Sequence, residues 1–183
     1  IRQDSQETLP PVEEDLLSIC GLAATTNKTI ATIVAERYPN WNEHLDFVVA
    51  AAQRYNAAKV AVNALDFDDL LLNWRRLLVE HPDLAARYGE QFRYLLLDEY
   101  QDTSPLEAEI VDRLAAVHRN LMVVGDDGQS IYSFRGADVG NILSFTERWP
   151  DAAVYRLEIN YRSRPPIIAL ANSTTETVTA GAS

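Results

Sequence analysis

Acidic, amide and guanidinium side chains follow three short apolar runs in this chain. Asp98 and Glu99 come directly after the first run, Gln129 lies just beyond the second, and Tyr161 and Arg162 lie just beyond the third. This combination suits phosphoryl transfer, which depends on positioning and on neutralising charge. A carboxylate can hold Mg²⁺ through its water shell, a neighbouring carboxylate can polarise an attacking water, and an amide or a guanidinium can stabilise the charge that develops.

The three apolar runs are typical of buried β-strands, and helical patterns separate them. We expect strands within 92–97, 121–124 and 153–159, and helices over 104–118 and 139–148. This alternation predicts an α/β fold with a parallel sheet and helices on its faces. Because ligands of such sheets bind beyond the carboxyl ends of the strands, the acid pair, the amide and the guanidinium are expected at one edge.

The first third of the chain is predicted to be helical. Apolar residues at helical spacing indicate a short helix near 16–20 and longer ones over 29–38 and 44–64. Small, polar residues over 173–183 predict a frayed end.

Two capping signals mark helix starts in the middle of the chain. Asp66 precedes an apolar helical face and has Asp69 as its capping partner. Ser104 and Glu107 form a second capping box, with Pro105 at the first helical position.

The composition is that of a globular protein without a membrane span. Of the 183 residues, 47% are hydrophobic, and no apolar run approaches the roughly 18 residues that cross a bilayer. The single cysteine, Cys20, excludes an internal disulfide, is expected as a small buried side chain, and fits a reducing, cytoplasmic setting. The chain starts at Ile1 without a signal-like stretch, which predicts a cut inside a longer protein.

The net charge bears on a nucleic-acid partner. A formal charge of −11 argues against broad phosphate contacts. Basic residues nevertheless gather within 156–164, where Arg156, Arg162 and Arg164 accompany a single acid. A locally basic groove on an acidic body stays open.

Four sequence blocks resemble superfamily 1A helicases of the UvrD/Rep/PcrA type. Residues 95–103 (LLLDEYQDT), 124–138 (VGDDGQSIYSFRGAD) and 157–163 (LEINYRS) resemble motifs II, III and IV of that family. Residues 65–70 (LDFDDL) resemble the segment where the family's chain re-enters its motor domain after a helical insertion, 1B. The blocks occur in the family's order and at about its spacing, so the ordered set is a specific signal.

The resemblance implies a domain organisation. Residues 1–64 would be a partial, all-α 1B-like subdomain, and 65–164 the second half of a RecA-like P-loop NTPase motor domain, 1A, with a parallel sheet and flanking helices. Residues 165–183 would be the start of the next segment and a flexible tail. The implied parent is an ATP-dependent 3′-to-5′ DNA helicase that couples ATP hydrolysis to movement on single-stranded DNA.

The family's nucleotide-site roles carry over to matching positions. Asp98 and Glu99 would hold Mg²⁺, and Glu99 would be the catalytic base. Gln129 would contact the γ-phosphate of ATP and couple the nucleotide state to DNA. Tyr161 would stack on adenine, and Arg162 would reach the γ-phosphate.

The resemblance also implies a DNA contact. Tyr132 and Phe134 would stack on bases of single-stranded DNA, and Arg135 would link this platform to the nucleotide site. The expected partners are single-stranded DNA and single–double strand junctions, with no membrane.

One component of a nucleotide-driven motor is missing from these residues. No G-x-x-x-x-G-K-[ST] loop occurs; the nearest imitation, 27–29 (NKT), has Leu22 and Asn27 at the glycine positions and no preceding strand. Backbone amides of such a loop must approach phosphates closely, which favours glycine. We therefore expect this chain alone to bind ATP weakly and to hydrolyse none, and its incomplete sheet to promote self-association.

Other interpretations stay open at this point. The parent could be a helicase–nuclease subunit, an RNA-directed motor, or a non-catalytic DNA- or protein-binding module of the same fold. The acid pair 98–99 could be a solvated turn, and residues 161–162 could form a structural cation–π or ion-pair site. Tyr132 and Phe134 could belong to the core.

Overall fold

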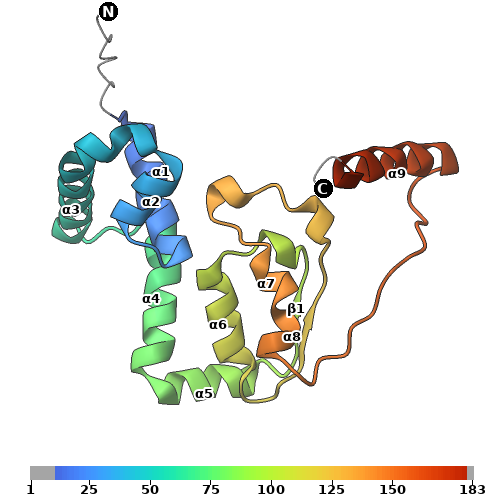
Figure 1. The fold of residues 1–183 in the computed structure, drawn as a ribbon. Helices are drawn as coiled ribbons and strands as arrows, with labels where there is room; N and C mark the ends of the chain where they lie inside the picture. Colours follow the sequence, from blue (N-terminus) through green and yellow to red (C-terminus); the bar gives the residue numbers. More distant parts are fainter. Residues whose placement is uncertain (1–10, 181–183) are drawn as a thin grey trace, which may run out of the picture. The chain divides into compact units, whose positions relative to one another are not determined.

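A computed structural model describes residues 11–180 of the chain, which divides into two compact units, Ile1–Arg148 and Trp149–Ser183 (Figure 1). The first unit contains almost all of the regular structure. Its helices and strands are α1 (Glu13–Thr26), α2 (Ile30–Arg37), η1 (Pro39–His44), α3 (Leu45–Ala61), α4 (Phe67–Glu80), α5 (Pro82–Gln91), β1 (Leu95–Leu97), η2 (Tyr100–Asp102), α6 (Pro105–Ala115), β2 (Leu121–Val123), η3 (Asp127–Gln129), η4 (Ser133–Arg135), α7 (Gly140–Leu143) and α8 (Phe145–Arg148). The second unit contains α9 (Pro165–Ala180).

The N-terminal helices pack around a core of their own. α1, α2 and α3 contact one another and bury aliphatic side chains: Ile19, Leu22, Ile33, Val34 and Val48. Cys20 is half-buried beside this core, and burial raises the pKa of its thiol. The predicted helices are therefore present, although α1 is much longer than the expected 16–20.

The capping boxes at Asp66 and Ser104 both form. The Asp66 side chain accepts from the Asp69 N–H at 2.8 Å, and the Asp69 side chain accepts from the Asp66 N–H at 3.1 Å. Ser104 and Glu107 exchange the equivalent bonds at the start of α6. Each box satisfies two backbone donors that a helix start would leave free, so α4 and α6 begin where the sequence predicts.

β1 and β2 form a two-stranded parallel sheet. Leu95, Leu96 and Leu97 pair with Leu121, Met122 and Val123 in that order. The intervening α6 also contacts α4, which stands beside it in Figure 1, and α5, which crosses below both. Together they enclose a second core of Leu78, Leu106, Ile110 and Leu114. The structure therefore agrees with the α/β expectation, as a mainly helical fold with a small parallel sheet.

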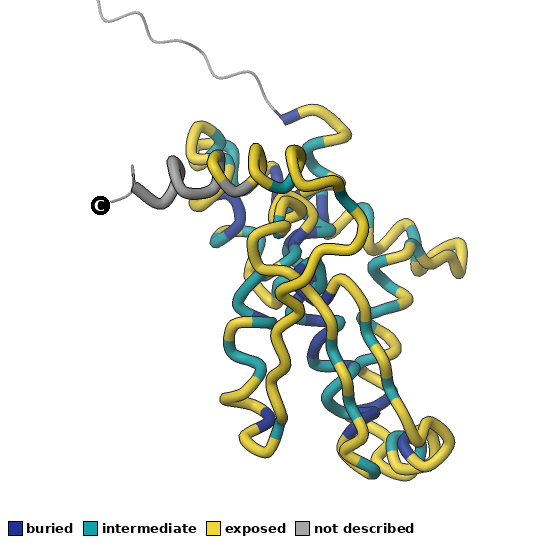
Figure 2. Tube along the Cα trace, turned by 90° about the vertical axis from the view of Figure 1, so that its right-hand side faces the viewer, coloured by how far each residue is buried: buried dark blue, intermediate teal, exposed yellow. Residues whose placement is uncertain are grey.

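The predicted third strand over 153–159 is absent from the described part of the chain, so this prediction is wrong. The segment has no regular structure, and its apolar side chains are exposed (Figure 2). A strand needs a neighbouring strand for its backbone hydrogen bonds. Apolar composition alone cannot supply that neighbour.

The C-terminal segment is helical where a frayed tail was expected. α9 extends from Pro165 to Ala180, and residues 181–183 lie outside the described range. Pro165 and Pro166 suit a first helical turn, and no glycine or further proline follows until Gly181. Residues 173–180 of the expected frayed end lie in α9, and fraying of that end stays a prediction.

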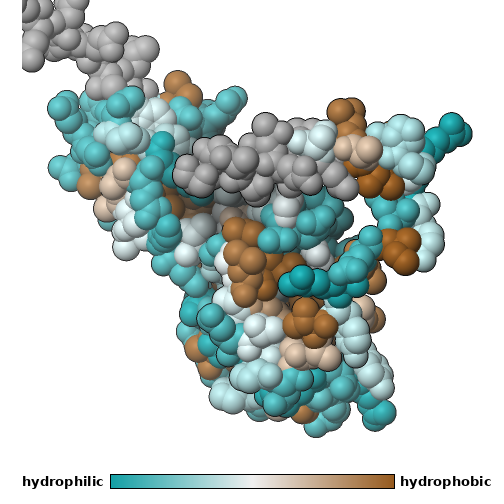
Figure 3. Space-filling model, turned by 45° about the vertical axis from the view of Figure 1, so that its right-hand side comes forward, coloured by the Kyte–Doolittle hydropathy of each residue, from teal (hydrophilic) through white to brown (hydrophobic). Residues whose placement is uncertain are grey.

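Apolar side chains reach the surface in several patches (Figure 3). On the sheet, Leu96 is 73% exposed and Met122 is 55% exposed, because they point away from the face that α6 covers. No single helix among residues 11–180 has the length and apolar character of a membrane span; α1 and α2 pass such a test only together, bent by 114°.

Candidate functional site

The carboxyl ends of β1 and β2 bring the acid pair next to the loop that carries Gln129. Beyond the paired residues the ladder continues, with the Val124 N–H donating to the Leu97 carbonyl at 2.8 Å and the Tyr100 N–H donating to the Val124 carbonyl at 2.9 Å. Asp98 and Glu99 therefore leave β1 at the edge where Gly125 and Asp126 leave β2. The first two of the three predicted groups share one edge of the sheet.

Glu99 has an unusual backbone conformation. Its φ and ψ are 51° and 43°, in the left-handed region that side-chain-bearing residues seldom adopt. The Asp98 carboxylate stabilises this turn by accepting the Glu99 N–H at 3.0 Å. Both side chains are exposed, so solvent and ligand can reach them.

Gln101 lies behind the acid pair and connects it to the second strand. Its Nε2 donates to Glu99 Oε2 at 2.8 Å, and its Oε1 accepts from the Asp126 N–H at 3.0 Å. The side chain is 1% exposed. The sequence indicated no role for Gln101: a glutamine two residues after Glu99 was a signal, but nothing in the sequence indicated that it is buried.

Asp126 extends the connection to Gln129. Its Oδ2 accepts from Gln129 Nε2 at 2.7 Å, and its Oδ1 accepts from the Gly128 N–H at 3.0 Å. A continuous chain of hydrogen bonds therefore runs from Glu99 through Gln101 and Asp126 to Gln129. The acid pair is not an isolated solvated turn.

Buried contacts of Tyr100 hold in place the loop that carries the acid pair, residues 98–102 (the acid-pair loop). Tyr100 is fully buried, contacts Phe145 edge-to-face at 5.7 Å between ring centroids, and its hydroxyl accepts from Arg148 at 2.8 Å. Arg148 also pairs with Asp112 of α6 at 3.1 Å. Burial raises the pKa of the Tyr100 hydroxyl above its ordinary value of 10.

The aromatic loop over 132–136 presents its rings to solvent. Phe134 is 57% exposed and Tyr132 is also exposed, so neither belongs to the core. Their ring centroids lie 5.9 Å apart, and the Arg135 guanidinium lies 5.7 Å from one and 5.5 Å from the other. The three side chains thus form one cluster, within the distance at which cation–π attraction acts.

The N-terminal helices support this aromatic loop. Arg37 of α2 donates to the Ser133 carbonyl at 2.8 Å. Gly136 has a φ of 89°, and a Cβ at this position would lie 2.5 Å from Thr25 Oγ1 of α1. The loop therefore approaches α1 as closely as a glycine allows.

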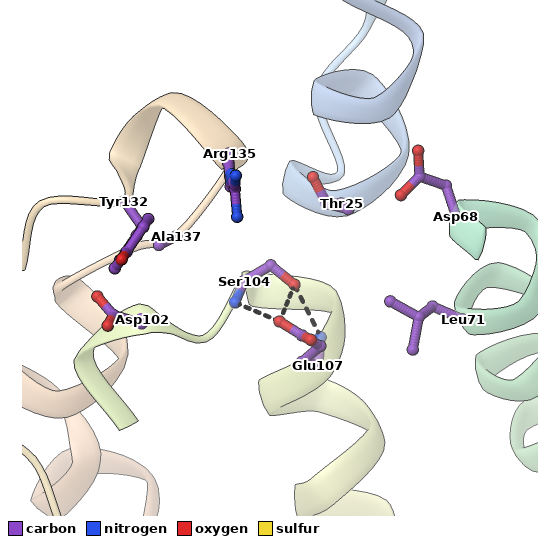
Figure 4. A pocket seen from close by; sticks show the side chains of 9 residues that line it. All are labelled: Thr25, Asp68, Leu71, Asp102, Ser104, Glu107, Tyr132, Arg135 and Ala137. Atoms are coloured by element: carbon purple, nitrogen blue, oxygen red, sulfur yellow. Dashed lines mark hydrogen bonds between the residues drawn. The ribbon is translucent and has the colours of Figure 1, made fainter. Parts of the chain in front are cut away.

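A cavity of about 380 Å³ lies below the aromatic loop (Figure 4). It is bounded by side chains from α1, α4, the start of α6 and the loop: Thr25, Asp68, Leu71, Asp102, Ser104, Glu107, Tyr132, Arg135 and Ala137. Asp102 Oδ1 is buried without a hydrogen-bond partner among the described residues. The acid-pair loop and the aromatic loop therefore share a polar cavity.

Tyr161 and Arg162 belong to the other unit, Trp149–Ser183. Tyr161 is 89% exposed and Arg162 is exposed, and Asn160 Oδ1 accepts from the Arg162 and Ser163 N–H groups at 2.9 Å. Their shared site with Gln129 stays a prediction, as does the alternative of a structural cation–π contact.

The carboxylates of Asp98 and Glu99 suit a Mg²⁺ site in which water and phosphate oxygens supply the other ligands. No three His, Cys, Asp or Glu side chains within residues 11–180 gather closely enough to hold a metal by themselves. Mg²⁺ in nucleotide sites commonly uses one or two carboxylates together with water and phosphate oxygens. The exposed Asp98, with Glu99 beside it, matches that requirement.

Comparisons with known proteins match most of the chain to one family. The family described as "UvrD/REP helicase N-terminal domain" matches residues 6–150. "DNA helicase II" of Rickettsia typhi is 45% identical over 121 residues, which are 66% of this chain and 18% of that protein. "ATP-dependent DNA helicase PcrA" of Leuconostoc citreum is 43% identical over 132 residues, 72% of this chain and 18% of that protein. The corresponding protein of Staphylococcus aureus strain Mu50 is 42% identical over 129 residues, 70% of this chain and again 18% of that protein.

The chain thus spans less than a fifth of the length of these relatives. The family match covers the acid-pair loop, the Gln129 loop and the aromatic loop, and it confirms the resemblance that those motifs carry. The chain belongs to the UvrD/REP helicase N-terminal domain family.

Proposed function

We propose that this chain is part of the RecA-like motor domain of an ATP-dependent DNA helicase that moves 3′-to-5′ on single-stranded DNA. The observation that carries the proposal is the hydrogen-bonded chain from Glu99 to Gln129 at the carboxyl ends of two parallel strands. Parallel α/β sheets bind their ligands at that edge. The proposed activity is that of the whole protein. The relatives are more than five times as long as the segment that they share with this chain.

Asp98 and Glu99 take the metal and base roles in this proposal. Mg²⁺ bound with ATP would bridge and neutralise phosphate oxygens. Asp98 would hold that ion. Glu99 would hold a water by its carboxylate and accept the water's proton as it attacks.

Gln129, Tyr161 and Arg162 complete the proposed nucleotide site. Gln129 has an amide that can reach a phosphate oxygen if it leaves Asp126. Tyr161 would stack on adenine, and Arg162 would neutralise charge on the γ-phosphate. Exposure of all three side chains supports their availability to a ligand.

The aromatic loop is the proposed single-strand contact. Stacking of a base on Tyr132 or Phe134 needs an exposed ring, and both rings are exposed. Arg135, over both rings, could meet the phosphate backbone. The hydrogen bond from Arg37 to this loop would hold the two rings in place when DNA is bound. The proposed partners are single-stranded DNA and junctions between single and double strands.

Substitution of Glu99 tests the proposal in the full-length protein. Glu99→Gln keeps the shape and the hydrogen bond from Gln101 but removes the base, so ATP binding should persist while turnover falls about 10²- to 10⁴-fold. Steady-state hydrolysis and nucleotide-binding titration measure the two quantities. Glu147→Gln, at an exposed glutamate of α8, is the matched control. Near-normal hydrolysis by Glu99→Gln would remove Glu99 from the base role.

A further inference from the structure

We propose that Gln101 is a positioning residue that makes the orientation of Glu99 depend on the position of the Gln129 loop. The inference rests on the proposed function of the site, since it assigns Gln101 to the proposed base and phosphate sensor. Gln101 touches neither proposed ligand; it acts through Glu99 on one side and Asp126 on the other.

The partners of Gln101 determine which way its amide faces. A backbone N–H can only donate, so the atom 3.0 Å from the Asp126 nitrogen must be the carbonyl oxygen. An ionised carboxylate can only accept, so the atom 2.8 Å from Glu99 Oε2 must be the amide nitrogen. The two contacts impose the same orientation, and a flipped amide would lose both.

The surroundings of Gln101 leave its side chain little room to move. The residue is 1% exposed, and an amide that lost its partners there would be buried and unsatisfied. A Cβ at Gly125 would lie 2.5 Å from Gln101 Oε1, so only a glycine lets the segment after β2 pass this close. Gln101 is therefore held by packing as well as by hydrogen bonds.

Asp126 connects the Gln129 loop to Gln101 because it is hydrogen-bonded to both glutamines. Its backbone N–H holds Gln101, and its carboxylate holds Gln129 at 2.7 Å. When Gln129 leaves Asp126 for a phosphate, the Asp126 carboxylate loses a partner, and the backbone that anchors Gln101 is released to shift. A shift there changes the position of the amide nitrogen that holds Glu99 Oε2.

The consequence for Glu99 concerns which oxygen faces the attacking water. With Gln101 anchored, Oε2 is occupied by an amide donor, and Oε1 is the oxygen left to accept a proton. Removal of the Gln101 amide, in contrast to its movement with the loop, lets the carboxylate rotate, which lowers turnover without removing the base. Misplacement of a reacting group by about 1 Å can lower a rate about 100-fold.

Two substitutions at Gln101 separate the two hydrogen bonds in the full-length protein. Gln101→Met keeps the volume and loses both bonds. Gln101→Glu can still accept from the Asp126 N–H, but when ionised it faces Glu99 as a like charge. Gln53→Met, at an exposed position of α3, is the matched control.

We expect both Gln101 variants to lower kcat for ATP about 10- to 100-fold, with the KM changed much less, and to weaken stimulation by single-stranded DNA. Both variants keep the Glu99 carboxylate, so ATP binding should change little in either. Gly125→Ala, which pushes on the retained amide, should resemble Gln101→Met.

The outcomes distinguish this inference from the proposed function. Loss of hydrolysis in Glu99→Gln with unchanged kcat and DNA stimulation in Gln101→Met overturns the inference alone. Normal hydrolysis in Glu99→Gln overturns the proposed function. If Gln101→Met does not fold, Gln101→Glu decides: a lowered kcat with little change in KM supports a positioning role, and unchanged kcat and DNA stimulation overturn it.

Discussion

Glu99 combines a strained backbone with an exposed, charged side chain. A residue with a Cβ in the left-handed region costs about 1 kcal/mol or more, and the side chain at φ 51° is held by Gln101 and by the Asp98 carboxylate on its own N–H. Such strain persists where the surrounding structure over-determines the conformation. Because Glu99 follows the end of β1, its exposed carboxylate lies at the sheet edge where a nucleotide would bind in the proposed function.

The exposed ring of Phe134 should contribute to DNA binding and little to folding. Phe134→Ala should weaken single-strand binding by about 1–3 kcal/mol for a stacked base, and should reduce stimulation of ATP hydrolysis by DNA. Fluorescence anisotropy with a labelled oligonucleotide measures the affinity, and thermal unfolding measures the stability. Phe47→Ala, at a comparably exposed phenylalanine of α3, controls for loss of a surface ring. Unchanged affinity in Phe134→Ala would exclude the stacking role.

The sequence predicted some residues of the candidate site and missed another. Asp98, Glu99 and Gln129 were identifiable because acids and amides at strand ends are chemically conspicuous. Gln101 was not, because its importance comes from burial against Gly125, a contact between the segments that follow β1 and β2. Local pattern carries residue type, whereas a buried hydrogen bond depends on tertiary packing.

At the scale of elements, local signals predicted helix starts and pairing decided the strands. The boxes at Asp66 and Ser104 need only residues three positions apart, so the sequence contains them completely. The expected run 92–97 narrowed to Leu95–Leu97, since only these residues pair with β2. The run 153–159 has comparable apolar character but no strand beside it, which no local pattern could reveal.

The start of α4 is tied to the end of α3 by a compact ion cluster. Lys59 Nζ lies 2.6 Å from Asp66 Oδ2 and 2.7 Å from Asp69 Oδ2, and the Tyr55 hydroxyl donates to Asp66 at 2.9 Å. Burial alone would raise the pKa of the Asp66 carboxyl, but the hydrogen bonds from Lys59, Asp69 and Tyr55 outweigh it and lower that pKa from its ordinary 3.8.

This cluster predicts a pH-dependent contribution to stability. Because the folded pKa of Asp66 lies below 3.8, the stabilisation is fully present above that value and is lost as the pH falls through the lowered pKa. Asp66→Asn keeps a capping side chain but removes the charge, so its free energy of unfolding should fall less steeply between about pH 5 and pH 2. Urea denaturation at a series of pH values measures the slope. Asp83→Asn, at an exposed aspartate in the first turn of α5, controls for the loss of a charge, and parallel slopes in wild type and Asp66→Asn would contradict the prediction.

At the scale of the whole molecule, one face of the sheet exposes apolar side chains. Leu96 and Met122 stand side by side on adjacent strands and are mostly exposed. Contiguous exposed apolar surface commonly marks a contact site or an aggregation risk. We propose that copies of this chain self-associate through that face.

Light scattering of the 183-residue chain over a range of concentrations tests this association. We expect the mean mass to rise with concentration, and Leu96→Thr, which keeps a strand-forming residue, to reduce the rise. Val60→Thr, at an exposed valine of α3, should leave the rise unchanged. A monomer at every concentration would contradict the proposal.

The contact between Thr25 and Gly136 connects α1, one of the N-terminal helices, to the aromatic loop, which is more than 100 residues away in the sequence. Two obstacles disfavour a side chain at Gly136. The φ of 89° is strained for a residue with a Cβ, and that Cβ would lie 2.5 Å from Thr25 Oγ1. Shortening Thr25 relieves the second obstacle and leaves the first. If the N-terminal helices were exchanged between relatives, the α1 surface that contacts the aromatic loop would have to stay the same. A bulkier side chain on that surface would displace the loop, even with the sequence of the loop unchanged.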